Sequence, residues 1–175
     1  KMVVTSCPGC FKVWSHDYAK GSYGGALGIE HDLKVVHTTQ LLADLMKQGK
    51  LKFSNRNDAK VTYHDPCHMG RNLGEKAIYE APRELLRAIP GVELTEMGRT
   101  KNVSWCCGSG GGVKSAFADF AMFTGEERVK EACETGAKVL ASACPFCQRN
   151  LDDSAKAMAS KISVLDVVEM VERAI

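Results

Sequence analysis

The stretch "KVLASACPFCQRNLDDSAK", residues 138–156, carries the local pattern from which the fold follows. Its first part, residues 138–143, is a short apolar run that predicts a buried strand. Cys144-Pro145-Phe146-Cys147 comes directly after this run, and the polar residues that follow have a composition typical of a helix. The stretch therefore predicts a strand that leads into a Cys-Pro-x-Cys turn and then into a helix.

The same alternation of short strands and amphipathic helices continues along the rest of the chain. Strands are expected at 2–6, 60–65, 92–97 and 138–143, and helices at 38–50, 81–89, 124–136 and 165–175. Thr38 or Thr39 is the expected cap of the first of these helices, and Thr124 that of the third. Strands that alternate with helices predict an α/β fold with short, mostly parallel sheets and flanking helices.

An internal repeat underlies this order. Residues 3–20 align with residues 140–156, and each copy is followed by a strand-then-helix segment, at 35–48 and 162–175. We therefore expect two related modules: residues 1–50 as the C-terminal part of a first, incomplete module, and residues 58–175 as a complete second one. The polar residues between them are the expected linker, and the incomplete first copy suggests a longer parent polypeptide.

Composition narrows the possible partners and the compartment. The chain has 175 residues, with 23 basic against 21 acidic side chains, so we expect neither nucleic-acid binding nor direct membrane insertion. No signal peptide precedes the eight cysteines, which are grouped as two CxxC pairs, one CC pair and two single residues. This grouping favours metal or redox chemistry in a reducing cytoplasm over structural disulfides.

Five of the cysteines form one constellation: Cys67, then Cys106 and Cys107 side by side, then Cys144 and Cys147. A structural zinc site needs only four ligands and usually draws them from two CxxC knuckles. An iron–sulfur cluster spreads its ligands over several irons, so adjacent thiolates can reach different atoms of one core. The spacing favours iron–sulfur over zinc and leaves both interpretations open.

Glycines follow the adjacent pair in "SWCCGSGGG", residues 104–112. Glycine allows backbone N–H groups to approach anionic sulfur without obstruction from side chains. A phosphate-binding loop is a poor match, because Val113 separates Gly112 from Lys114-Ser115 and occupies the place of the third glycine of a dinucleotide motif.

Three segments resemble one known family. "YHDPCHMGR" (63–71), "CCGSGGG" (106–112) and "ACPFC" (143–147) are similar to the cysteine-rich CCG domain of heterodisulfide reductase subunits of the B and D type. The resemblance implies that the five cysteines of the constellation bind a non-cubane [4Fe-4S] cluster in which one thiolate bridges irons. It also implies that Cys7 and Cys10 are two ligands of a second [4Fe-4S] cluster, completed by upstream sequence.

The resemblance further implies the activity of an oxidoreductase subunit. In such a subunit the cluster transfers electrons, and the reductases of this family reduce the CoM-S-S-CoB heterodisulfide, a small anionic substrate. The alternative is an electron-transfer subunit of another membrane- or flavin-linked oxidoreductase, such as a glycolate, lactate or glycerol-3-phosphate dehydrogenase, or of a sulfite-reductase-associated complex. Other redox subunits are the implied partners, and a partner is the one implied route to a membrane. A zinc-stabilised binding module without redox function is the alternative of another class.

Several residues near the motif have expected supporting roles. Of His64 and His68, which flank Cys67, one is expected to orient the loop and the other to donate a hydrogen bond to sulfur. The glycine after the cysteine pair, Gly108, is expected beside the cluster. Arg71 and Lys114 are candidates to offset its negative charge or to meet an anionic substrate, with a solvated surface as the equal alternative.

Three further residues have expected apolar roles. Cys133 lies outside the motif in a predicted helix and is expected to be a small buried residue. Trp105 and Phe146 are neighbours of expected ligands and are predicted to shield the cluster from water.

Overall fold

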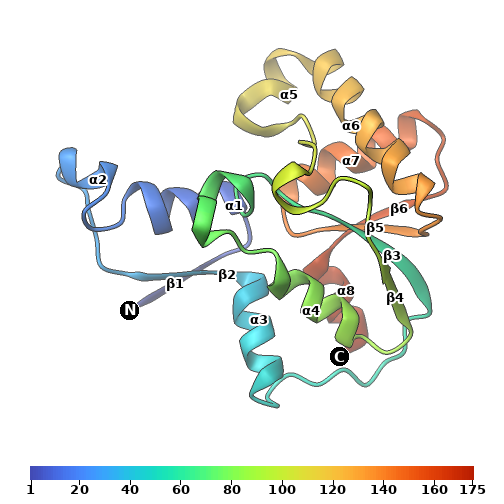
Figure 1. The fold of residues 1–175 in the computed structure, drawn as a ribbon, viewed down its shortest axis with the longest axis horizontal. Coiled ribbons are helices and arrows are strands. Elements are labelled where there is room, and N and C mark those ends of the chain that lie inside the picture. The colour runs from blue at the N-terminus through green and yellow to red at the C-terminus, as the bar shows by residue number, and fades with distance from the viewer.

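Strands and helices alternate along the whole chain in the computed structural model, which describes residues 1–175 (Figure 1). The strands are β1 (Met2–Thr5), β2 (Lys34–His37), β3 (Ala59–His64), β4 (Val92–Thr95), β5 (Val139–Ser142) and β6 (Ser163–Asp166). The α-helices are α1 (Pro8–Lys12), α2 (Tyr23–Ala26), α3 (Thr38–Lys47), α4 (Glu80–Ala88), α5 (Val113–Ala116), α6 (Ala118–Glu134), α7 (Pro145–Ala157) and α8 (Val167–Ala174). A π-helical turn spans Val13–Asp17, and 3-10 turns span Arg71–Lys76, Lys101–Val103 and Gly110–Gly112.

Every strand pairing is parallel. β1 pairs with β2 in a two-stranded sheet, and the other four strands form a second sheet in the order β4-β3-β5-β6. The prediction of an α/β fold with short parallel sheets and flanking helices is confirmed. That the two sheets belong to two related modules stays a prediction.

Helices cover both faces of the four-stranded sheet (Figure 1). On one face α3, α4 and α8 enclose a core that includes Val61, Tyr63 and Leu85. On the other face α6 and α7 pack over Leu140 and its neighbours. Side chains of adjacent strand residues point to opposite faces, so β5 contributes to both cores.

The expected linker lies against the larger core. Leu51 and Phe53 pack on it, and the backbone N–H groups of Ser54 and Asn55 donate to the carbonyl of Ala174, at 2.8 and 3.0 Å. Helix α3, which follows the two-stranded sheet, packs against α4 and α8 of the other sheet. These contacts hold residues 1–50 against the rest of the chain.

Helix α6 begins at Ala118, so the prediction that Thr124 caps its N-terminus is wrong. The hydroxyl of Thr124 instead donates to the carbonyl of Phe120 at 2.8 Å, inside the helix. Gly125 does not end the helix, because it lies where α6 meets α7. A Cβ atom there would overlap Oγ of Ser154.

Helix α3 is capped by His37 rather than by Thr38 or Thr39. The His37 side chain accepts a hydrogen bond from the backbone N–H of Thr39, and the Gln40 side chain accepts from the backbone N–H of His37 at 2.9 Å. This reciprocal arrangement is a capping box, in which an imidazole replaces the usual hydroxyl or carboxylate. A histidine is seldom an N-cap, so the threonines were the stronger signal.

Candidate metal centre

The five cysteines of the constellation come from three places that the sheet brings together. Cys67 follows β3, and Cys144 follows β5 as the N-cap of α7, with Cys147 in the first turn of that helix. Because β3 and β5 are parallel neighbours, their carboxyl ends lie at the same edge of the sheet. Cys106 and Cys107 reach this edge from the loop that precedes α5 and α6.

The five thiols form one continuous chain of contacts. The pKa of Cys67 is raised, first by its hydrogen bond with Cys106, whereas the pKa of Cys106 is lowered by hydrogen bonds with Cys107 and Cys67. The pKa of Cys147 is raised by hydrogen bonds with Cys107 and Cys144, and Cys147 in turn lowers the pKa of Cys144. Each thiolate is therefore stabilised at the expense of a neighbour, because like charges this close cannot all ionise alone.

This donor set fits a cationic or polynuclear metal group. A metal ion or cluster favours deprotonated sulfur and offsets the repulsion among several thiolates. Five thiols in mutual contact exceed the four that a tetrahedral zinc site uses. The arrangement can therefore hold an inorganic core with more than one metal atom.

Cys7 and Cys10 lie at the end of β1 and in the first turn of α1, as Cys144 and Cys147 lie around the start of α7. Cys7 is half-buried and Cys10 is exposed. Burial is the first cause that raises the pKa of Cys7, and its contact with the Cys10 side chain adds to the rise. These two thiols contact each other and stand apart from the contact chain of five.

One cavity of about 450 Å³ is shared by both groups of cysteines. All five cysteines of the constellation line it, together with Cys7, His68, Phe146 and the glycines 110–112. Lys12 and Asp17, which pair at 2.7 Å, also belong to its wall. Sequence reasoning missed Lys12 and Asp17, because nothing local places the helix after Cys10 opposite a loop a hundred residues away.

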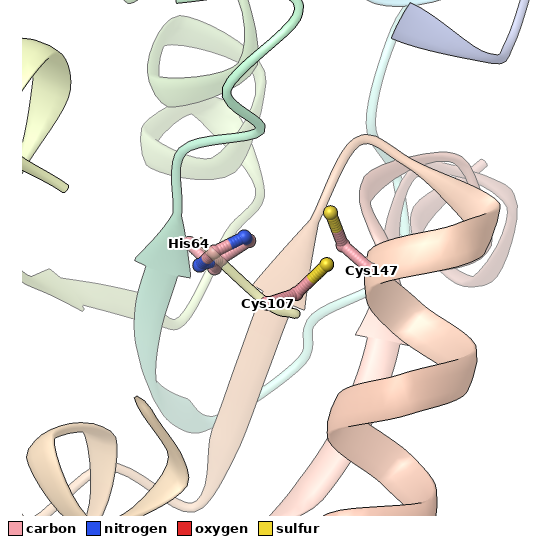
Figure 2. A group of neighbouring side chains, drawn as sticks. All are labelled: His64, Cys107 and Cys147. Atoms are coloured by element: carbon pink, nitrogen blue, oxygen red, sulfur yellow. The ribbon is translucent and has the colours of Figure 1, made fainter. Parts of the chain in front are cut away.

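His64 is fully buried beside the cysteines. One of its ring nitrogens lies within 4.8 Å of the sulfurs of Cys107 and Cys147, and Figure 2 shows its ring on the side of both sulfurs. Nδ1 accepts a hydrogen bond from Nε of Arg128 at 3.1 Å. Burial, followed by the charge of Arg128, lowers the pKa of His64 to about 3, so the ring is neutral.

His68 and Gly108 contact the sulfurs of two cysteines. Nδ1 of His68 lies 3.4 Å from the sulfur of Cys67. The backbone N–H of Gly108 donates to the sulfur of Cys106 at 3.4 Å. Gly108 also has a φ of +89°, and a Cβ there would lie 2.7 Å from Cβ of Thr124, so only glycine fits between this loop and α6.

Arg71 and Lys114 both have protein partners outside the cavity wall. Arg71 donates to the backbone carbonyl of Ser104 and so ties the loop after Cys67 to the loop before Cys106. Its charge also acts to lower the pKa of Cys67. Lys114 pairs with Asp153 at 2.5 Å. The structure thus gives both residues a role between elements of the protein.

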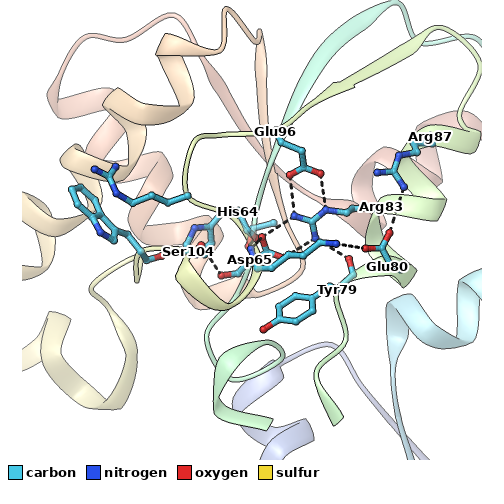
Figure 3. A network of polar contacts seen from close by, with 12 residues as sticks. His64, Asp65, Tyr79, Glu80, Arg83, Arg87, Glu96 and Ser104 are labelled. Atoms are coloured by element: carbon cyan, nitrogen blue, oxygen red, sulfur yellow. Dashed lines mark hydrogen bonds and ion pairs between the residues drawn. The ribbon is translucent and has the colours of Figure 1, made fainter. Parts of the chain in front are cut away.

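Two buried arginines hold the loops of the site, and sequence reasoning missed both. Arg83 is fully buried and makes two-pronged ion pairs with Asp65, at 2.7 and 2.8 Å, and with Glu96, at 2.7 and 3.0 Å (Figure 3). Asp65 also accepts from the backbone N–H of Lys101 at 2.7 Å. The loop after β3 is thereby joined to the loop that leads to Cys106.

Arg128, the other buried arginine, lies on the buried face of α6 between Gly125 and Val129. A charged residue at helical spacing among buried positions was the available signal for it.

Three expectations about apolar residues need correction. Cys133 is exposed, and its sulfur lies 3.3 Å from Oγ of Ser160; Ala132 instead takes the buried position on α6. Trp105 is 41% exposed and carries the guanidinium of Arg99 over its ring, 3.8 Å from the ring centroid, so it lies outside the cavity wall. Phe146 lines the cavity but is 60% exposed.

The fold and the gathered thiols define an α/β domain with a cysteine-built binding site at the carboxyl edge of a parallel sheet. Residues 61–152 match the model of the cysteine-rich domain named CCG, which covers more than half of the chain. The chain therefore belongs to the CCG cysteine-rich domain family, and the resemblance inferred from its motifs is confirmed.

Its relatives are subunits of oxidoreductases. The chain is 46% identical over its full length to the D-type subunit of the dihydromethanophenazine:CoB–CoM heterodisulfide reductase of Methanosarcina barkeri, covering 41% of that protein. It is 34% identical over 98% of its length to the B-type subunit of the fumarate reductase (CoM/CoB) of Methanothermobacter marburgensis, covering 32% of it. A probable iron-sulfur-binding oxidoreductase, FadF of Bacillus subtilis, is 32% identical over the whole chain, which covers 24% of it.

The chain thus spans about two fifths or less of the length of these relatives. None of its helices is both long enough and apolar enough to cross a bilayer.

Proposed function

We propose that the chain is an iron–sulfur redox subunit in which Cys67, Cys106, Cys107, Cys144 and Cys147 hold a non-cubane [4Fe-4S] cluster. The observation that carries the proposal is the contact chain of five thiols at one edge of the sheet. A cubane cluster takes four cysteines, as does a structural zinc ion, so the fifth thiol favours a different core. Relatives that are named iron–sulfur or heterodisulfide-reductase proteins support this assignment.

The substrate proposed for the parent enzyme is a small disulfide of the CoM-S-S-CoB type. Such a reaction takes up two electrons and two protons, breaks the S–S bond and releases two thiols. When bound, the cluster would supply the electrons one at a time, after receiving them from partner redox subunits. The cavity beside the five cysteines provides the space, and His68 in its wall can hold a proton next to the sulfur of Cys67.

A second candidate is an electron-transfer subunit that meets no substrate of its own. The range of names among relatives that match nearly the whole chain favours it, because they include a fumarate reductase subunit as well as heterodisulfide reductases. In this function the cavity would hold the cluster and the neighbouring side of the protein, and the electrons would pass to another subunit.

Anaerobic analysis of iron, acid-labile sulfide and zinc tests the cofactor assignment. We expect about four irons and about four sulfides per chain, with visible absorption. A colourless protein that contains zinc and no sulfide would contradict it and favour a zinc-stabilised binding module.

Addition of the heterodisulfide to the oxidised protein separates the two redox functions. A new or altered EPR signal on addition supports disulfide reduction. A cluster that accepts electrons from a reductant but keeps the same spectrum with and without heterodisulfide supports the electron-transfer function.

A further inference from the structure

His64 is a buried polar residue that faces the cysteines without being one of them. It ends β3, and its side chain is completely buried. Nε2 is buried and has no hydrogen-bond partner in the protein. Because Nδ1 is engaged by Arg128, Nε2 is the ring nitrogen left for the sulfurs of Cys107 and Cys147, to which the ring lies so close (Figure 2). Buried polar atoms are rarely left alone, so this one indicates a role toward the group that the cysteines hold.

Arg128 decides which nitrogen of the His64 ring carries the proton. The Nε atom of Arg128 lies 3.1 Å from Nδ1 of His64, and a guanidinium group can only donate hydrogen bonds. Nδ1 must therefore present its lone pair. In the neutral ring the single proton then lies on Nε2, on the side of the sulfurs.

Arg128 is itself fixed, because each nitrogen of its guanidinium group has an acceptor. One terminal nitrogen donates to the carbonyl of Arg99 at 3.0 Å and to the carboxylate of Glu131 at 2.5 Å. The other donates to Oγ of Ser104 at 3.1 Å. The guanidinium group cannot turn away from His64 without losing these contacts in a buried place, where an unpaired charge is costly.

We infer that Arg128 fixes His64 as its Nε2-protonated tautomer, and that His64 thereby donates a hydrogen bond to sulfur of the cluster instead of ligating iron. The inference rests on the proposed function, since it assumes a cluster on the five cysteines. A donor that faces sulfur stabilises the reduced, more negative state and so raises the reduction potential. Arg128 is then a positioning residue that acts through His64.

A matched pair of substitutions separates the two ring nitrogens. In His64→Asn the amide oxygen can still accept from Arg128, but nothing replaces the Nε2–H group. In His64→Gln the longer side chain brings an amide N–H toward the position of Nε2. We expect His64→Asn to keep its iron and sulfide but to shift the midpoint potential to more negative values, measured by EPR-monitored redox titration. His64→Gln should restore part of the shift.

Isotope labelling tests the tautomer and the absence of ligation directly. In the metal-free chain labelled with ¹⁵N-histidine, the NMR shifts of His64 should be those of the Nε2-protonated ring, and Arg128→Gln should mix the tautomers. In the loaded chain, pulsed EPR should give a weak ¹⁵N coupling that is lost in His64→Asn. A His64→Asn protein that fails to hold the cluster is replaced by these two measurements on the native sequence.

The outcomes that overturn the inference are specific. An unchanged potential in His64→Asn, a strong ¹⁵N coupling typical of an iron ligand, or an Nδ1-protonated ring would each do so. Failure of the proposed function has a different signature, the absence of iron and sulfide from the native chain. In that case the cluster part of the inference is overturned as well, and the NMR result alone decides the tautomer.

Discussion

At the scale of single residues, Cys107 and Cys133 offer a matched comparison within one chain. Cys107 is buried in the contact chain of five thiols, whereas Cys133 is exposed on α6 near Ser160. We expect Cys107→Ser to lower the iron content strongly or to change the EPR spectrum, because serine oxygen is a harder and less acidic ligand than thiolate. Cys133→Ser should leave both unchanged. Equal effects in iron analysis and EPR would contradict the assignment of the ligands.

At the scale of elements, the N-cap of α3 makes stability depend on pH. His37 is buried, its Nδ1 accepts from the backbone N–H of Thr39, and its Nε2 lies 3.2 Å from the carbonyl of Ser6. Burial lowers its pKa from 6.5 to about 4. The unfolded chain therefore takes up the proton first as the pH falls. Between pH 6.5 and about 4 the free energy of unfolding should fall, by at most about 3 kcal/mol from this residue.

The variant His37→Asn isolates this contribution, because asparagine also caps helices but does not titrate. His64 acts in the same direction, with its pKa lowered to about 3, and Asp166 in the opposite one, with its pKa raised to about 6 by burial. Both remain in the variant. The difference between the two denaturation profiles should thus carry the His37 dependence, and parallel profiles would refute it.

The contact between α6 and α7 depends on the absence of a side chain at Gly125. A Cβ there would overlap Oγ of Ser154 and would lie 2.8 Å from Nδ2 of Asn150. Asn150 cannot easily move, because it donates to the carbonyls of Cys107 and Ala121, at 2.6 and 2.9 Å. We expect Gly125→Ala to lower the free energy of unfolding by about 2 kcal/mol, as overpacked cores do.

Gly110→Ala is the control for this substitution, since a Cβ at that glycine has open space around it and its φ is not positive. Urea denaturation of both variants measures the difference. A Gly125→Ala protein as stable as the control would show that the two helices can separate at little cost.

At the scale of the whole molecule, the two groups of cysteines should differ in what they can hold. Cys7 and Cys10 offer two thiols, whereas an iron–sulfur cluster normally takes four ligands. We therefore expect residues 1–175 to bind about four irons, and the double variant Cys7→Ser/Cys10→Ser to bind about as many. The double variant Cys144→Ser/Cys147→Ser should lose them. Iron analysis that shows equal losses in both double variants would overturn this assignment.

Local signals in the sequence predicted most of the fold and the positions of the motif cysteines. The strand before Cys144 and the parallel sheet were predicted because apolar runs and turn residues act over a few neighbours. The arginines that hold the site, Arg83 and Arg128, were missed because their partners lie far away in sequence. The entry of Cys7 into the same cavity as the five cysteines was missed for the same reason: it depends on how two separate sheets pack.

The origin of the five sulfurs from loops far apart in the chain bears on the order of assembly. Residues 67 and 147 meet only after β3 and β5 have paired, and parallel pairing across a long intervening segment is among the slower steps of folding. A nascent chain offers isolated thiols; only a nearly finished domain offers the complete set. Insertion of the inorganic core is therefore a late, post-folding event, and slow folding of β5 would delay maturation without any change in the ligands.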